Sequence, residues 1–391
     1  MAISMSYWRR CLSGFVAIAL TGALAASAIA ISPPADSRRA AEQLRAEASR
    51  YREMQDRWQP VGEGAALQPG DRDRRVEQLR ELLQLLGDYR GLPGPITLLP
   101  PDASRYDSAV QSAVERFQRR HGLEVTGDAG EATLAELAIS PAVRAHQLEL
   151  NAERWEKLPL PDRDRYVLVN IPDYRLQLIE DGREVLGMRT VVGKSSTRTP
   201  PITSRITNVV FNPTWTVPRS ILLTDLLPKA RNNPEAMHNR GYRVVSYRSG
   251  NTTTISPDSI DRAAHGHATL RQISGPGNTL GRVKFVLPNK QSIFLHDTQA
   301  QSLFEEHQRA FSHGCVRLEH PEELAYALLR KQGWDRTRIA QVTTGTEIMN
   351  IRVKKPARLF ITYLTAWIDK DGRPQFRRDI YHRDQPANVT H

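Results

Sequence analysis

Apolar residues recur at helical spacing in the first part of the chain. Residues 37–59 carry them on one loose stripe, at Leu44, Ala48, Tyr51 and Trp58, among mostly polar neighbours. This pattern predicts a polar helix, which a proline and a glycine-rich stretch then end. Within the segment 32–72 we expect this helix to be a spacer or the start of a helical scaffold.

A compact pattern of three amphipathic helices follows over residues 73–140. In the first helix apolar side chains recur three or four positions apart, at Val76, Leu79, Leu83 and Leu86. The second carries Val110, Ala113, Val114 and Phe117, and the third carries Leu134 and Leu137. These stripes predict a small three-helix bundle. Residues 141–160 predict a linker helix behind it.

From residue 161 onward the pattern changes to short alternating strands and tight turns. Strands are expected at 166–170, 175–179, 184–192, 206–211, 283–287 and 292–296, and a last hairpin has arms at 359–368 and 375–381. The pairs Asp181-Gly182 and Asp371-Gly372 are typical hairpin turns, and a helix is expected at 321–331. The fold class predicted is therefore multidomain, α plus mostly β, with the β-rich domain over residues 161–385.

One long insertion interrupts the predicted strands. Residues 218–277 are rich in Asn, Ser, Gly and Pro. Ordered segments of this length inside a compact domain are usually lids or substrate-binding loops. We expect this insertion to be a lid over a cleft.

The first residues indicate where the protein works. Arg9 and Arg10 precede an apolar stretch at 11–31, which ends in the small-x-small sites ASA at 26–28 and AIA at 28–30. This is typical of a secretory signal peptide. The alternative is an uncleaved membrane anchor, because about 20 apolar residues can span a bilayer. Either interpretation exports the rest of the 391-residue chain, which we expect in the periplasm.

The chain has a formal charge of +11 at pH 7. Such a charge favours an anionic partner without choosing among nucleic acid, membrane and acidic wall polymer, and a solvated basic surface explains much of it. The sequence has no zinc-finger spacing, no RNP-type signature and no dense basic tail. A nucleic-acid partner is therefore not expected.

The cysteine count points to chemistry. The chain has two cysteines, and Cys11 lies in the targeting segment. The exported part therefore carries Cys315 alone into an oxidising compartment, where an unpaired cysteine is either a liability or a working thiol.

The residues around Cys315 favour a working thiol. His296-Asp297 precedes the run Ser312-His313-Gly314-Cys315-Val316-Arg317. A thiol must become a thiolate to attack a carbonyl, and an imidazole can accept its proton. In an extended strand His313 and Cys315 would share a face, while His296 would return from a separate strand. Gly314 would admit a substrate close to the backbone, whose amides could hold an oxyanion.

Other interpretations of these residues were weighed. Cys315 could be a buried, inert cysteine. The residues His296, His307, His313 and Cys315 could form a zinc set, but their spacing fits no standard zinc pattern, and we expect no metal and no organic cofactor. Asp297 could orient His296 through its carboxylate or through its carbonyl oxygen. Trp215 is interpreted as a core residue and not as a substrate platform.

Two stretches resemble known families. The string FQRRHGL at 117–123, with TG at 126–127 and TL at 133–134, resembles the small peptidoglycan-binding module of wall enzymes. The histidine at 296 with SHGCVR at 312–317 resembles the catalytic signature of YkuD-type L,D-transpeptidases, and the segments around residues 212–215, 273–285 and 363–381 are similar to the larger proteobacterial members. The resemblance covers about residues 73–385.

The resemblance implies a role for each site residue. Cys315 is the expected nucleophile, His296 the proton acceptor and donor, and His313 a supporting group. Ser312 and Gly314 belong to the expected oxyanion and substrate site, and Arg317 orients the loop or meets a substrate carboxylate.

The implied reaction is the formation of 3-3 cross-links in peptidoglycan. A tetrapeptide stem would acylate Cys315 with release of D-Ala, and the side-chain amine of a neighbouring stem would take the acyl group. Carbapenem-type inhibitors are expected to react with the same thiol, and the module at 73–140 is expected to tether the enzyme to the wall. Water, a free D-amino acid or an outer-membrane protein stay open as acceptors. A cysteine endopeptidase is a rival, although the common wall peptidases place the cysteine before the histidine; a silent wall-binding protein is another, although the motif is intact.

Overall fold

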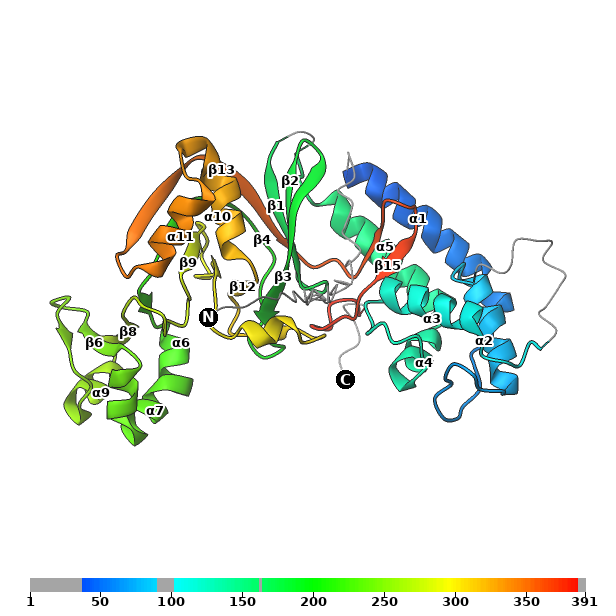
Figure 1. The fold of residues 1–391 in the computed structure, drawn as a ribbon, viewed down its shortest axis with the longest axis horizontal. Helices are drawn as coiled ribbons and strands as arrows, with labels where there is room; N and C mark the ends of the chain where they lie inside the picture. Colours follow the sequence, from blue (N-terminus) through cyan, green and yellow to red (C-terminus); the bar gives the residue numbers. More distant parts are fainter. Residues whose placement is uncertain (1–36, 90–101, 162–163, 386–391) are drawn as a thin grey trace, which may run out of the picture.

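The computed structural model describes residues 37–89, 102–161 and 164–385. The predicted signal peptide or anchor at 1–31 lies outside these residues. None of the helices in the described ranges is both long and apolar enough to cross a membrane. Figure 1 shows a helical part at one end, a strongly curved sheet in the middle and a small lobe at the other end.

The helical part confirms the predicted stripes. Its elements are α1 (Ser37–Glu53), the 3-10 turn η1 (Gln55–Arg57), α2 (Arg74–Leu85), α3 (Ser108–Arg120), α4 (Glu131–Leu137) and α5 (Pro141–Glu156). Asp73, Asp107 and Ser140 cap the N-termini of α2, α3 and α5 by accepting backbone amide hydrogens, which satisfies donors that the helices leave free. The predicted apolar residues of α2 and α3 are buried on one face of each helix.

The middle of the molecule is a sheet that closes on itself. Its strands are β1 (Tyr166–Asn170), β2 (Arg175–Glu180), β3 (Arg183–Gly193), β4 (Ile202–Phe211), β9 (Val283–Val286), β10 (Leu295–His296), β11 (Ala310–Ser312), β12 (Val316–Leu318) and β13 (Met349–Thr362). Within the described residues their order is β11-β3-β12-β10-β9-β4-β13-β1-β2, and β3 also pairs with β2. This second pairing makes the sheet barrel-like. The predicted turn Asp181-Gly182 joins β2 to β3 with both residues at positive φ, 51° and 73°, as a two-residue hairpin of type I′ requires.

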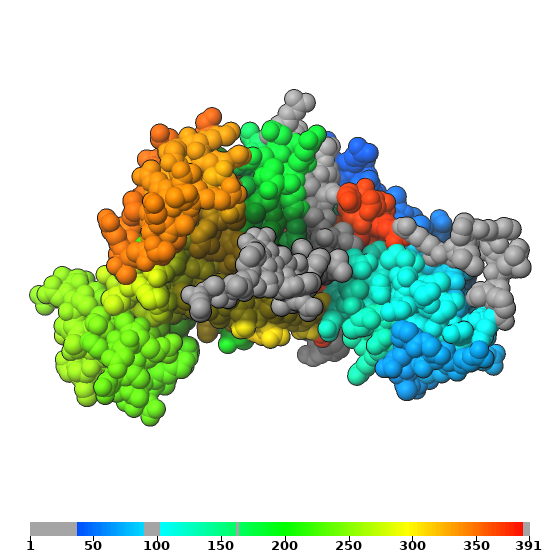
Figure 2. All heavy atoms as spheres, viewed as in Figure 1, coloured from blue at the N-terminus to red at the C-terminus, as the bar shows by residue number. Residues whose placement is uncertain are grey.

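The insertion is a folded lobe rather than a set of loops. It contains β5 (Trp215–Thr216), α6 (Arg219–Ile221), the π-helical turn η2 (Leu222–Leu226), α7 (Leu227–Asn232), α8 (Pro234–Asn239), β6 (Tyr242–Ser246), β7 (Thr252–Thr253), α9 (Pro257–Ala264) and β8 (Ala268–Gln272). The strands form their own sheet in the order β5-β8-β6-β7, over a separate core that includes Trp215, Tyr242 and Leu270. The core assignment of Trp215 is therefore confirmed. Figure 2 shows this lobe protruding at the lower left.

The strand predicted at 292–296 is too long. Only Leu295 and His296 pair as β10, because the side chain of Asn289 captures the backbone just before them. Asn289 Oδ1 accepts from the amide of Ile293 at 3.0 Å, and its Nδ2 donates to the carbonyl of Ile293 at 2.7 Å. These bonds occupy the backbone amide and carbonyl of Ile293, which therefore does not pair with β9.

The predicted C-terminal hairpin is also shorter than expected. Residues 359–362 continue the long strand β13, and the hairpin arms are β14 (Ala366–Ile368) and β15 (Pro374–Phe376). Outside the sheets, the remaining elements are η3 (Gln301–Phe304), α10 (Pro321–Leu329), η4 (Arg330–Gln332) and α11 (Arg336–Thr344). Helices α10 and α11 cover the barrel core.

One apolar core joins the helical part to the hairpin. It takes in buried side chains of α1 to α5 together with Phe360, Trp367 and Phe376. Asn151 on α5 donates to Thr365 Oγ1 at 2.8 Å and accepts from the Thr365 amide at 2.9 Å, in a buried position. The segment expected to be a spacer or the start of a helical scaffold forms α1, and the expected linker helix is α5; the two helices pack together and against β14.

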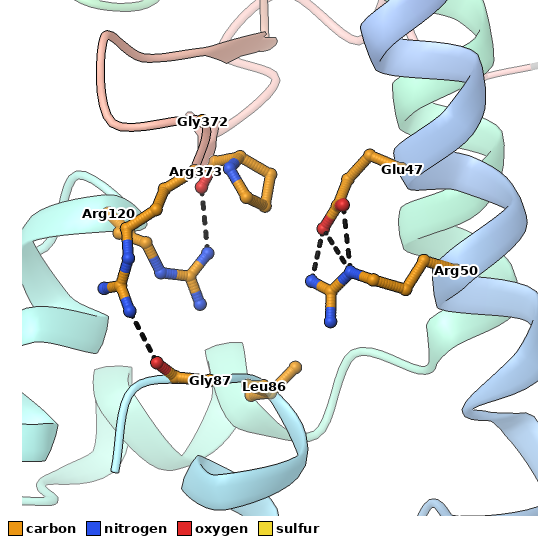
Figure 3. A pocket seen from close by; sticks show the side chains of 8 residues that line it. Glu47, Arg50, Leu86, Gly87, Arg120, Gly372 and Arg373 are labelled. Carbon is orange, nitrogen blue, oxygen red and sulfur yellow. Dashed lines mark hydrogen bonds and ion pairs between the residues drawn. The ribbon is translucent and has the colours of Figure 1, made fainter. Parts of the chain in front are cut away.

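A pocket of about 170 Å³ lies at this junction, between α1, the end of α2 and the β14–β15 hairpin (Figure 3). Its arginines are already engaged. Arg50 pairs with Glu47, Arg120 donates to the carbonyl of Pro374 at 2.9 Å, and Arg373 donates to the carbonyl of Gly87 at 2.6 Å. Behind them Arg120 forms a buried ion pair with Asp88. These hydrogen bonds link α3 and the turn after α2 to the β14–β15 hairpin, while Arg50 and Glu47 pair within α1.

Candidate active site

Strand register gathers the site on one face of the sheet. In β10, His296 lies opposite Lys284 of β9 and opposite Arg317 of β12. Residues opposite one another on neighbouring strands point to the same face, so these three side chains form one row. Cys315 directly precedes β12, and the amide of Val316 donates to the carbonyl of Phe294 at 3.2 Å. Phe294 and Cys315 therefore stand beside the row.

The loop that carries Cys315 is a bend and not an extended strand. Residues 313–315 separate β11 from β12, and Gly314 has a φ of 115°, which favours glycine. Ser312 Oγ donates to the carbonyl of Cys315 at 2.6 Å and accepts from the amide of Gly314 at 3.0 Å. The prediction that His313 and Cys315 share a strand face is wrong. His313 is exposed, whereas Cys315 is partly buried.

Two threonines that the sequence analysis missed hold this loop in place. Thr197 Oγ1 donates to the carbonyl of Ser312 at 2.9 Å, and Thr199 Oγ1 donates to the carbonyl of Gly314 at 2.8 Å. The amide of Thr199 in turn donates to the hydroxyl of Tyr381 at 3.1 Å. Each threonine is 115 residues from the carbonyl it binds, so no local pattern marks them.

His296 is a neutral imidazole whose tautomer is set by one hydrogen bond. It is 4% exposed, and its Nδ1 bonds to the carbonyl oxygen of Asp297. Because a carbonyl can only accept, Nδ1 carries the hydrogen and Nε2 is left as the acceptor. Burial, then the positive charge of Arg317, lowers the pKa of His296 to about 3, so the ring is uncharged at neutral pH.

Asp297 acts on His296 through its backbone. Its carboxylate accepts from the amides of Arg282 and Thr298, each at 2.6 Å. Both carboxylate oxygens are thus bound to the backbone, and the carbonyl is the part of Asp297 that orients the imidazole. This settles the alternative that the sequence left open.

The surroundings of Cys315 act on its pKa in opposite directions. Burial raises the pKa of Cys315, while the backbone of Phe294 and the positive charges of Lys284 and Arg317 lower it. Its Sγ is 3.9 Å from the carbonyl oxygen of Ser292. Arg317 Nε is buried without a hydrogen-bond partner in the described part of the chain. Lys284 and Arg317 therefore place two positive charges near the Cys315 thiol.

Lys284 and Phe294 are site residues that the sequence analysis did not single out. Lys284 Nζ lies 4.0 Å from the centroid of the Phe294 ring, and that ring is 5.5 Å from the ring of His296. The available signal was the alternation of β9, in which Lys284 stands between the buried residues Val283 and Phe285. Alternation puts Lys284 on the face of β9 opposite to theirs, the face that it shares with His296.

The other two candidate histidines lie elsewhere. Burial, then the charge of Lys194, lowers the pKa of His313, and Asp225 of the insertion acts in the opposite direction. His313 is therefore within electrostatic reach of the insertion. His307 Nε2 lies 2.7 Å from the carbonyl oxygen of Gly122 in the helical part, and its contacts tie the loop between β10 and β11 to that part.

Family comparisons agree with this geometry. Residues 164–350 match the L,D-transpeptidase catalytic domain named YkuD, and residues 72–137 match a "Putative peptidoglycan binding domain". The chain therefore contains a YkuD-type L,D-transpeptidase catalytic domain behind an N-terminal peptidoglycan-binding domain. This confirms the predicted α plus mostly-β fold class.

Individual relatives are less complete matches. A "Putative L,D-transpeptidase" of Haemophilus influenzae is 36% identical over 247 residues, which cover 62% of this chain and 49% of that protein. The chain thus spans about half the length of this curated relative. Among solved structures, an L,D-transpeptidase (residues 123–326) from Xylanimonas cellulosilytica is 17% identical, covering 77% of this chain and 98% of that one, with a TM-score of 0.23. L,D-transpeptidase 3 from Mycobacterium tuberculosis, in complex with a faropenem-derived adduct, is 10% identical, covering 51% and 60%, with a TM-score of 0.26. Scores this low carry no weight for the fold.

Proposed function

We propose that the protein forms 3-3 cross-links in peptidoglycan through a thioester on Cys315. The observation that carries the proposal is the neutral, buried His296, whose Nδ1 bonds to the carbonyl of Asp297 and which stands opposite Arg317, two residues after Cys315. A neutral imidazole with a fixed tautomer is the form that can take a proton during nucleophilic attack.

Acylation proceeds by attack of Cys315 Sγ on the carbonyl carbon of the third stem residue. The thiol proton passes to His296 Nε2 as the S–C bond forms. Backbone amides of the Gly314 bend stabilise the oxyanion of the tetrahedral intermediate. The C–N bond to the terminal D-Ala then breaks, and the imidazolium returns the proton to the leaving amine. The products of this step are a thioester and free D-Ala.

Transfer repeats these steps in reverse order. The acceptor is the side-chain amine of the third residue of a neighbouring stem, and this residue is expected to be meso-diaminopimelate. The amine attacks the thioester carbonyl and loses a proton to His296. The C–S bond breaks, and the proton returns to the thiolate of Cys315. No metal or organic cofactor takes part in these steps.

The setting of the reaction is the cell wall. We infer a periplasmic location from the predicted signal segment and from the two domain types, which act on or bind peptidoglycan in their families. The net charge of +11 favours attachment to an acidic wall polymer. The peptidoglycan-binding domain is proposed to raise the local concentration of stem peptides around the catalytic domain.

The nucleophile is tested with a carbapenem. An activated thiol opens a strained lactam as it attacks a peptide carbonyl, so intact-mass measurement should find one adduct on the protein, mapped by peptide digestion to Cys315. Cys315→Ala should give none, and the exposed Ser302→Ala should label like the wild type. Equal labelling of Cys315→Ala would remove the basis of the proposal.

The acceptor is tested with purified tetrapeptide muropeptides. A product mass equal to two muropeptides minus one D-Ala supports 3-3 cross-linking. A tripeptide product alone identifies water as the acceptor and makes the protein a carboxypeptidase. Products that carry an added D-amino acid or an attached protein, in reactions supplied with these, contradict a strict preference for stem peptides.

A further inference from the structure

Lys284 is a partly buried cation without a carboxylate beside it. It stands on β9 between Val283 and Phe285, which are both fully buried. Burial lowers the pKa of Lys284, and among the residues that the structure describes the Cys315 thiol is the charged group that acts against this. A lysine that is taken out of water without a partner destabilises the fold. A position of this kind needs a functional explanation.

The register of the sheet places Lys284 on the same face as His296 and Arg317. Lys284 is opposite His296, and the aromatic ring under its ammonium belongs to Phe294, whose carbonyl binds the amide that follows Cys315. A cation above an aromatic face is held there by the ring quadrupole. The Phe294 ring therefore fixes the position of the Lys284 ammonium above the sheet, near the loop that carries Cys315.

Few charged groups stand close enough to stabilise a thiolate at Cys315. Lys284 on β9 and Arg317 on β12 are the charged groups that act on Cys315, and the imidazoles of the site are His296 on β10 and His313 on the bend. His296 is neutral, so it supplies no positive charge at rest, and His313 is exposed. A thiolate at this position therefore depends on Lys284 and Arg317.

We propose that Lys284 is a positioning residue that acts through Cys315: its ammonium, seated on the Phe294 ring, stabilises the thiolate form of the nucleophile. This rests on the proposed function only in taking Cys315 as the nucleophile. An opposite charge nearby shifts a titration by about 1–3 pKa units. Loss of the lysine charge should therefore move the apparent pKa of Cys315 up by about one unit, which lowers its reactivity at neutral pH about tenfold.

The test is the pH profile of Cys315 alkylation by iodoacetamide. The thiolate sulfur forms a bond to the methylene carbon as the C–I bond breaks and iodide leaves. The rate is followed by peptide mass for Cys315 alone, in a Cys11→Ala background. We expect Lys284→Met and Lys284→Gln to shift the midpoint upward, Lys284→Arg to restore most of it, and the exposed Lys331→Met to match the wild type.

Three results overturn the inference. The midpoint of Lys284→Met and Lys284→Gln could equal that of the wild type, or Lys284→Arg could shift as far as the neutral variants, which would indicate packing and not charge. All three variants could also fail to unfold cooperatively, which would make the lysine structural. Failure of the proposed function looks different: wild-type Cys315 resists alkylation at every pH, or the midpoint shifts as expected while muropeptides stay unchanged.

Discussion

Two imidazoles accompany Cys315 in the sequence, and the fold gives them unlike surroundings. His296 is buried, neutral and hydrogen-bonded through Nδ1 to the carbonyl of Asp297. His313 is exposed on a bend and lies near charges of the insertion. A general base needs a defined tautomer and a fixed position, and His296 meets both conditions.

Replacing each imidazole should separate their roles. His296→Ala is expected to lower the rate of Cys315 acylation by a carbapenem by about 10²-fold or more, as for a lost general base. His313→Ala should retain slow acylation. Single-turnover rates measured by intact mass check both. Acylation of His296→Ala at the wild-type rate would transfer the base to His313.

At this scale the sequence predicted what a short motif can encode. Cys315 and His296 could be assigned because their residue types and order are diagnostic. Lys284 could not, because its role depends on the pairing of β9 with β10. The same applies to Thr199, whose hydroxyl binds the carbonyl of Gly314 from a loop far along the chain. Only pairing in space shows what these two residues contact.

Among the elements, the insertion has the clearest boundary. It leaves the barrel at the end of β4 and returns at the start of β9, where Phe211 pairs with Val283 and the amide of Asn212 donates to the carbonyl of Arg282 at 2.8 Å. Its core touches Phe294, which also packs on the barrel core. The insertion is thus attached at two adjacent points, and its core contacts the site residue Phe294.

This attachment allows the whole lobe to be removed. Replacing residues 213–281 by Asn-Gly should close β4 and β9 as a two-residue hairpin and leave the barrel folded. We expect Cys315 to remain reactive to a carbapenem, while the KM for muropeptides rises or turnover is lost, because lids commonly capture substrate. Steady-state kinetics and circular dichroism provide the check. Unchanged kinetics would mean that the lobe does not take part in catalysis.

The sequence located this insertion but not its interior. Its strands β5 and β7 have two residues each, too few for alternation to be recognised. They exist because β8 and β6 provide ladders beside them. In contrast, β1 was predicted to the residue, since all five of its residues are buried between β2 and β13.

For the whole molecule, the packing of the helical part adds most to what the sequence predicted. The sequence predicted a separable wall-binding module, a spacer and a linker, because each helix has its own stripe. What the stripes cannot show is the identity of the surface that covers them. Trp155 on α5 and Trp367 on β14 are both buried in one core, so the helical part shares its core with the β14–β15 hairpin and with one face of β1 and β13.

A chain that begins at residue 141 should therefore fold poorly. It loses α1 to α4 and exposes large side chains such as Trp155, Trp367 and Phe376, each contributing roughly 1.5–3 kcal/mol when buried. A few such losses approach the net stability of a typical domain, about 5–15 kcal/mol. We expect no cooperative melting transition by circular dichroism, whereas a chain that begins at Ser37 should melt like the full protein. A stable, carbapenem-reactive fragment 141–385 would restore the tether as an independent module.

The core shared by the helical part and the hairpin also affects when the fold can be completed. Its members run from Ala40 on α1 to Phe376 on β15, so α1, which packs mainly on α5, gains the rest of its cover only when the hairpin has been made. Until the ribosome has released those residues, the apolar faces of α1 and α5 have no β14–β15 hairpin to pack against. Long-range closure of this kind slows folding. We therefore expect this core to be completed only after synthesis, and a chain cut short before the hairpin to leave the apolar faces of α1 and α5 partly uncovered.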